Sequence, residues 1–83
     1  MPELCTYKGI KIEILYNEHN PPHFHAEYAG DRASFNMDGE IIAGKLKPKQ
    51  ERAIKKFLKE HNKEILDNWN LAREGKPLCK IEL

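Results

Sequence analysis

The chain has 83 residues, of which 40% are hydrophobic and 33% are charged, and its formal net charge is +1. This length suits one small domain, and the composition is that of a folded chain rather than a disordered one. No apolar run approaches the roughly 20 residues that cross a bilayer, and the first residues lack the apolar stretch of a secretory signal. We therefore expect a single domain over residues 1–83 that is cytoplasmic and makes no membrane contact.

The first strand predicted from the pattern covers residues 10–16, which read IKIEILY. Isoleucine stands at every second position from Ile10 to Ile14. A period of two in hydrophobicity is typical of a strand with one buried face. Pro21 and Pro22 then interrupt the pattern, because proline cannot donate a hydrogen bond to a neighbouring strand.

A β-hairpin is predicted for the next part of the chain. From residue 23 onward, apolar and polar side chains alternate again, and Gly30-Asp31 fits a two-residue turn in which glycine takes a positive φ. This turn gathers the apolar side chains of both strands on one face, which a shift of one residue would prevent. It places His25 opposite Asn36 on the polar face.

A helix is predicted for the second half of the chain. Pro48 fits its first position, because proline lacks an N–H that the first helical turn leaves unpaired in any case. Apolar residues then recur every three or four positions, as on the buried side of an amphipathic helix. At Asn62 the pattern would divide into two helices, over residues 48–60 and 62–74, although the apolar side runs through this point.

Strands followed by a helical half predict an α+β fold, with helices packed on an antiparallel sheet. Asp38-Gly39 is a second hairpin signal that leads into a short strand over residues 40–43, and residues 78–83 alternate weakly. We expect a small antiparallel sheet of three to five strands in the N-terminal half, with a C-terminal strand as a further candidate. One long helix or two shorter C-terminal helices would pack on it.

Charge is distributed unevenly along the chain. Residues 45–63 contain eight basic and two acidic side chains, a net charge of +6, which leaves −5 for the rest of the chain. A basic helix face of this kind can follow a phosphate backbone, and it can equally be a solvated surface. The pattern predicts contacts with nucleic acid by Lys45, Lys47, Lys49, Arg52, Lys55, Lys56 and Lys59.

Three of the four histidines lie in the heptapeptide HNPPHFH, residues 19–25. On a strand, His23, His25 and Glu27 share one face, with successive members about 6.5–7 Å apart. Imidazole and carboxylate side chains at this spacing can share a divalent transition metal such as zinc, iron or manganese. The predicted metal ligands are His19, His23, His25 and Glu27.

Two other interpretations of the heptapeptide are open. Without a metal, His19, His23 and His25 would be catalytic as general acids and bases, because histidine titrates near neutral pH. Ser34 is expected on the same face, but without evident oxyanion donors. Alternatively, the histidines simply occupy the polar face of a hairpin, and the two prolines set a corner between strands.

Cys5 and Cys79 are the only cysteines, and they stand near opposite ends of the chain. They form no CxxC motif. In a reducing cytoplasm we expect two free thiols rather than a disulfide or a metal-binding pair.

The segments GIKI, YNEHNPPHFHAEY, GKL and NWNLAREGKPLCKIEL are similar, over nearly the whole chain, to a family of small bacterial proteins of unknown function. The heptapeptide at residues 19–25 carries the resemblance, and Trp69 also matches. The resemblance implies a bacterial cytoplasmic protein, often encoded beside a second small uncharacterised protein in a toxin–antitoxin-like gene pair. Some members carry the label of transcriptional regulator, and the resemblance assigns no catalytic residue.

Two hypotheses about function follow. The first is a component of a two-protein module, toxin–antitoxin-like or regulatory, that contacts a small protein encoded by an adjacent gene and also nucleic acid. The second is a nuclease or other hydrolase that uses the histidine cluster, with or without a metal. The first needs no additional ligand, and the two are compatible if the partner covers the histidine face.

Overall fold

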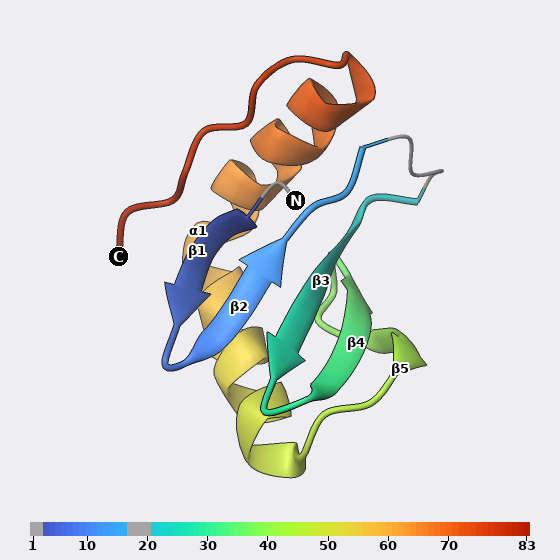
Figure 1. Ribbon diagram of the computed structural model, residues 1–83, viewed down its shortest axis with the longest axis vertical. Coiled ribbons are helices and arrows are strands. Elements are labelled where there is room, and N and C mark those ends of the chain that lie inside the picture. The colour runs from blue at the N-terminus through green and yellow to red at the C-terminus, as the bar shows by residue number, and fades with distance from the viewer. Residues whose placement is uncertain (1–2, 17–20) are drawn as a thin grey trace.

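The computed structural model describes residues 3–16 and 21–83 of the chain. Five antiparallel strands form one sheet in the order β1-β2-β3-β4-β5, and α1 follows them (Figure 1). The predicted α+β fold, with a sheet first and a long helix after it, is confirmed. The elements are β1 (Glu3–Tyr7), β2 (Ile10–Glu13), β3 (His23–Tyr28), β4 (Asp31–Asn36), β5 (Ile41–Gly44) and α1 (Pro48–Arg73).

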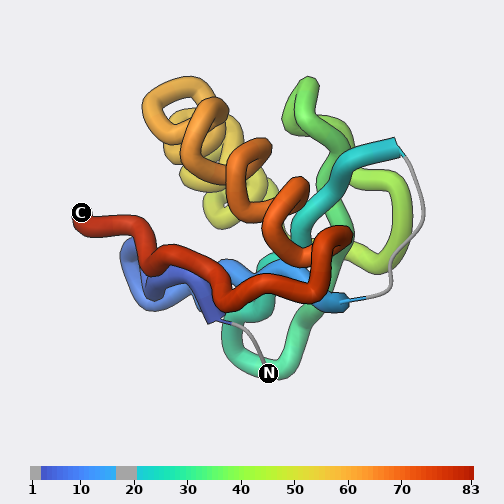
Figure 2. The backbone as a smooth tube through the Cα atoms, turned by 90° about the horizontal axis from the view of Figure 1, so that it is seen from above, coloured from blue at the N-terminus to red at the C-terminus, as the bar shows by residue number. Residues whose placement is uncertain are grey.

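One face of the sheet packs against α1. Figure 1 shows the helix behind the strands, and the view from above in Figure 2 also places it on one side of them. Trp69 of α1 is 1% exposed and lies in the core between the helix and the sheet. In the described part of the chain, no helix or strand covers the opposite face. The core side chains of the three central strands stand at alternate positions, as predicted: Ile10, Ile12, Phe24, Ala26, Ala33 and Phe35.

The helix α1 is kinked but continuous. His61 has non-helical backbone angles, with φ −125° and ψ 22°, one residue before the predicted break at Asn62. Phe57 and Ile65, on either side of the kink, are both fully buried, so both halves keep their apolar side on the sheet. The ring of His61 lies 4.9 Å from that of Phe57, and its Nδ1–H donates to Glu64 Oε1 at 2.6 Å. The kinked residue therefore has partners in both halves.

The helix ends at Arg73, and a glycine two residues later reverses the chain. The N–H of Gly75 donates to the carbonyl oxygen of Ala72 at 3.1 Å, and that of Lys76 donates to Leu71 at 2.9 Å. With Gly75 at φ 72°, these two bonds form a Schellman motif, which satisfies the last helical carbonyls. The hydroxyl of Tyr16 donates to the carbonyl oxygen of Lys76 at 2.9 Å. This bond holds the segment that follows α1 close to the residues that follow β2.

The length of α1, 26 residues, would suffice to cross a bilayer, but charged side chains occur along all of it. Within residues 3–16 and 21–83, no helix is both long and apolar enough to span a membrane.

The hairpin between β3 and β4 turns one residue earlier than predicted. Its turn residues are Ala29 and Gly30, with φ of 51° and 88°, so both take the positive φ of a type I′ turn. His25 therefore pairs with Ser34 and not with Asn36. The pairing differs from the prediction by two residues, and each side chain stays on its predicted face because strand side chains repeat with a period of two.

The edge of the sheet at β1 corrects two details of the sequence analysis. β1 is a strand that the pattern does not indicate, and residues 78–83 are not a strand. This C-terminal segment still runs beside β1, as Figure 2 shows, and the N–H of Ile81 donates to the carbonyl oxygen of Leu4 at 3.0 Å. Asn68, which is 2% exposed, holds the segment on α1 because its Oδ1 accepts the N–H of Cys79 at 2.7 Å.

Cys5 and Cys79 are both free thiols in the structure. Burial, with the nearby carboxylates of Glu3 and Glu64, raises the pKa of the Cys5 thiol to about 11. A thiol with this pKa stays protonated at neutral pH and is a weak nucleophile, so Cys5 acts as a small apolar side chain at the edge of the core.

Candidate functional site

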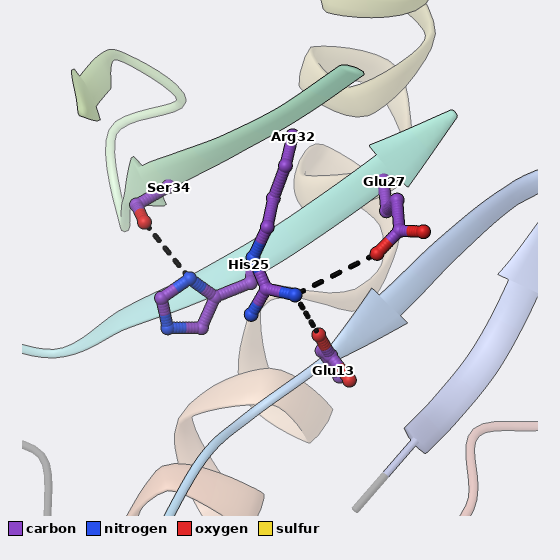
Figure 3. Close-up of polar contacts among 5 residues, drawn as sticks. All are labelled: Glu13, His25, Glu27, Arg32 and Ser34. Carbon is purple, nitrogen blue, oxygen red and sulfur yellow. Dashed lines mark hydrogen bonds and ion pairs between the residues drawn. The ribbon is translucent and has the colours of Figure 1, made fainter. Parts of the chain in front are cut away.

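The face of the sheet that points away from α1 carries polar side chains that the strand register brings together. Glu13 on β2 pairs with His25 on β3, and His25 pairs with Ser34 on β4. Opposed side chains on neighbouring antiparallel strands have Cβ atoms about 4.5–5.5 Å apart. A carboxylate, an imidazole and a hydroxyl therefore lie side by side, and we call these three residues the polar row (Figure 3).

His25 and Ser34 are in direct contact. The Nδ1 atom of His25 lies 2.8 Å from Ser34 Oγ, and His25 is 9% exposed. The hydroxyl donates when Nδ1 is unprotonated and accepts when Nδ1 carries the proton, so this contact suits proton transfer in either direction. The two side chains line a hollow of about 230 Å³, whose other walls are Arg32, Ala33, Ala43 and Gly44.

Glu13 is a buried carboxylate on the face of the sheet that points away from α1. Its side chain is 1% exposed, and Arg32 of β4 reaches across β3 to place Nη1 2.9 Å from Glu13 Oε1 (Figure 3). The same Nη1 lies 3.6 Å from Glu27 Oε1. Neither oxygen of Glu13 has a partner in hydrogen-bond geometry among the described residues, so the Arg32 contact is an ion pair that balances the charge and leaves both acceptors unfilled.

This unfilled carboxylate distinguishes the polar row from an ordinary solvated surface. A buried acceptor without a hydrogen bond costs about 1–3 kcal/mol, so a folded chain contains few of them. Glu13 and Arg32 therefore form a charged pair whose carboxylate is buried beneath the surface of the polar row. Beside it, the Ser34–His25 pair supplies a hydroxyl and an imidazole at the wall of the hollow.

The predicted metal ligands are brought together only in part. The rings of His23 and His25 have centroids 5.4 Å apart. Glu27 takes part in the ion pair with Arg32 described above. His19 lies outside the described residues. Within those residues, no three histidine, cysteine, aspartate or glutamate side chains gather as they would around a metal ion.

His23 joins the proline corner to the core. Its Nδ1 lies 2.9 Å from the carbonyl oxygen of Pro21, and because a carbonyl only accepts, this contact selects the Nδ1–H form of the ring. The same ring lies 5.0 Å from that of Trp69 on α1. At this position the structural interpretation of the heptapeptide is favoured, since His23 holds the corner against the helix.

The residues predicted to contact nucleic acid are all exposed, and those on α1 share one face. At 3.6 residues per turn, the basic side chains of α1 from residue 49 to residue 63 fall within about a third of the helix circumference, opposite its buried side. Lys45 and Lys47 lie just before the helix. We call the following set the basic face: Lys49, Arg52, Lys55, Lys56, Lys59 and Lys63.

Sequence reasoning identifies the histidines but misses Glu13 and Arg32 as members of the site. The alternation places Glu13 on the polar face of its strand, which is the one available signal. Its neighbour across the sheet is set by a long connection between β2 and β3, and not by a tight turn, so the spacing of residues does not fix that pairing.

The comparisons with known proteins address the family and not the activity. No curated protein and no solved structure shows a significant match to the chain. The family model of the DUF4160 domain, a domain of unknown function, matches residues 9–70, which include the polar row and the basic face. Because this match covers most of its length, the chain belongs to the DUF4160 family.

Proposed function

We propose that the chain is the binding component of a two-protein module, toxin–antitoxin-like or regulatory, in the bacterial cytoplasm. Its partner is a small protein encoded by an adjacent gene, and nucleic acid is a second ligand of the module. One observation carries the proposal: the buried, incompletely bonded carboxylate of Glu13 lies on a sheet face that no other described element covers. The resemblance to a family with paired genes supplies the kind of partner.

A protein partner suits this face for electrostatic reasons. Glu13 is already removed from water in the free chain, so its desolvation adds little to the cost of binding. Arg32, which is 39% exposed, presents the charge of this pair at the surface, where a carboxylate of the partner would accept a hydrogen bond from its guanidinium. Polar groups arranged in this way contribute more to specificity than to affinity.

Co-expression with the product of the adjacent gene is expected to give one complex. Both chains should elute together in size-exclusion chromatography, with a mass by light scattering that contains both. Ser34→Lys places a long cation in the polar row and should weaken the complex at least 100-fold. Titration calorimetry on the separately purified chains measures this change.

Asn70→Lys is the matched control, because Asn70 is an exposed residue of α1 and lies on the other layer of the molecule. It adds the same side chain away from the polar row, and its affinity for the partner should stay within about twofold of that of the unmodified chain. Two separate elution peaks for the unmodified chains would contradict the proposal. An equal loss of affinity in both variants would exclude the sheet face as the contact surface.

The contact between His25 and Ser34 favours a second candidate function, which is hydrolysis. In this reaction Ser34 Oγ attacks a carbonyl or phosphoryl group in the adjoining hollow while His25 Nδ1 takes its proton. The imidazolium then gives the proton to the leaving group, and water hydrolyses the covalent intermediate. Arg32 on the wall of the hollow would stabilise the developing negative charge.

Ser34→Ala and His25→Ala are each expected to lower hydrolysis of a p-nitrophenyl ester or phosphodiester by about 10²–10⁴-fold, the range for a lost general base or nucleophile. His23→Ala should retain most of the activity, since that ring packs on Trp69. Release of p-nitrophenolate by the purified protein measures the rates. Turnover of the unmodified chain no faster than that of Ser34→Ala would rule out this function.

A further inference from the structure

A groove opens beside the basic face, between α1 and the turn that joins β4 to β5. Its volume is about 340 Å³. The turn and the helix meet closely at its base, since a Cβ on the buried Gly39 would lie 3.2 Å from Lys55 Cγ. Asn62 Nδ2 also donates to the carbonyl oxygen of Met37 at 3.4 Å. The residues that line the groove are Met37, Asp38, Lys55, Leu58, Lys59 and Asn62.

The turn wall of this groove is held in place by its own hydrogen bonds. The Oδ1 atom of Asn36 accepts the N–H groups of Asp38 and Glu40, each at 2.9 Å, and the N–H of Gly39 donates to the carbonyl oxygen of Asn36 at 3.1 Å. These bonds fix the backbone from which the Asp38 side chain extends. The groove therefore has a wall whose backbone is fixed and that carries the carboxylate of Asp38.

The two walls differ in chemistry. The helix wall carries Lys55 and Lys59, which belong to the basic face, and the turn wall carries Asp38. Apolar atoms of Met37 and Leu58 lie in the same lining. A simple anion would meet a carboxylate here, so the groove is not built for a phosphate alone. It suits a ligand that is anionic at one end, flat and apolar in the middle, and rich in N–H donors at the other end.

We propose that the groove binds one unstacked base of a single-stranded nucleic acid whose phosphates follow the basic face. This inference rests on the proposal that nucleic acid is a ligand of the module. The phosphates lie on the lysine side, where their charge is balanced, and the base enters between Met37 and Leu58 with its edge toward Asp38. A carboxylate accepts two adjacent N–H groups, and guanine presents such a pair on its Watson–Crick edge.

A duplex fits this surface less well than a single strand. The buried side of α1 lies on the sheet, and the turn at Gly39 flanks it, so no helix or loop of the basic face projects far enough to enter a duplex groove. The bases of a single strand can rotate out and reach a shallow groove. The basic face extends over about 21 Å at 1.5 Å per residue, which accommodates several consecutive nucleotides.

Fluorescence anisotropy with labelled 12-nucleotide probes tests this inference. The probes are oligouridylate, the same strand with two central guanines, their DNA counterparts and a duplex of the guanine strand, each from 50 to 200 mM salt. The guanine-containing single strand should bind at least tenfold tighter than the duplex and than oligouridylate. The RNA and DNA arms show which sugar is preferred.

Substitutions separate the two walls. Lys55→Ala/Lys59→Ala should weaken binding of every single strand at least tenfold and reduce the salt slope by about 1.4, which is about 0.7 for each lost phosphate contact. Asp38→Asn should reduce the preference for guanine to less than threefold without lowering affinity for oligouridylate. Lys11→Ala/Lys80→Ala removes the same charge elsewhere and should change affinity by less than twofold. Thermal melts confirm that each variant is folded.

The outcomes distinguish this inference from the proposal on which it rests. If the duplex binds as tightly as the single strand, or if Asp38→Asn leaves the guanine preference intact, the basic face still binds nucleic acid and the base-binding groove is wrong. If no probe binds at 50 mM salt, or if the two lysine pairs have equal effects, nucleic-acid binding by the basic face is wrong as well.

Discussion

Replacing Arg32 with alanine is expected to lower the free energy of unfolding by about 2–3 kcal/mol. Among the described residues, the substitution leaves the carboxylate of Glu13, 1% exposed, without an opposing charge in contact. Loss of one partner from a buried ion pair costs about 3–5 kcal/mol, and we expect less because Arg32 itself is 39% exposed and partly screened by water. Urea denaturation followed by the fluorescence of Trp69, the only tryptophan, measures the change.

Glu13→Gln separates charge from packing in this experiment. It keeps the shape of the side chain and removes its charge, so the double variant Arg32→Ala/Glu13→Gln should recover most of the lost stability. Lys11→Ala removes a cation from the same sheet face and should cost less than about 0.5 kcal/mol. An undiminished loss from Arg32→Ala in the Glu13→Gln background would mean that the arginine stem stabilises the sheet by packing alone.

Gly44→Ala is expected to destabilise the fold by about 3 kcal/mol or more. Gly44 has φ 72°, and a Cβ added there would lie 2.2 Å from the carbonyl oxygen of Arg32. The left-handed conformation costs a residue with a Cβ about 1–2 kcal/mol, and a clash with a backbone atom cannot be relieved by a rotamer change. The same oxygen accepts the N–H of Lys45 at 3.1 Å, so moving it also weakens the end of β5.

Gly30→Ala is the matched comparison for this second variant. Its φ is 88°, but a Cβ there would meet nothing within 4 Å, so only the backbone term of about 1–2 kcal/mol applies. Thermal denaturation followed by circular dichroism should show a clearly lower Tm for Gly44→Ala, at about 4–8 °C per kcal/mol for a domain of this size. Equal Tm values would show that the contact with Arg32 relaxes at little cost.

The parts of the fold that could be predicted are those with local signals. Alternating isoleucines mark β2, and Pro48 marks the start of α1 where the structure has it. β1 could not be predicted because a bulge between Glu3 and Cys5 breaks its period of two. The hairpin register was wrong by two residues because Ala29 takes φ 51°, a conformation that favours glycine and that the sequence gives no reason to expect there.

The candidate site could be predicted only up to the strand that carries it. The heptapeptide identifies β3, and the alternation places His25 on the polar face. The contact between Arg32 on β4 and Glu13 on β2 crosses β3 diagonally. It depends on the pairing of β2 with β3, which core packing sets and a short turn does not. Contacts of this kind follow from the whole fold, so the buried carboxylate that distinguishes the site is visible only in three dimensions.

The C-terminal segment along β1 has a consequence for assembly. The N–H of Ile81 bonds to the Leu4 carbonyl of β1, so the C-terminal segment obstructs that edge of the sheet, while β5 at the opposite edge has no strand beside it in the described chain. Growth of a cross-β polymer requires two free sheet edges on every molecule. Copies of this chain that join edge to edge would therefore stop at a pair.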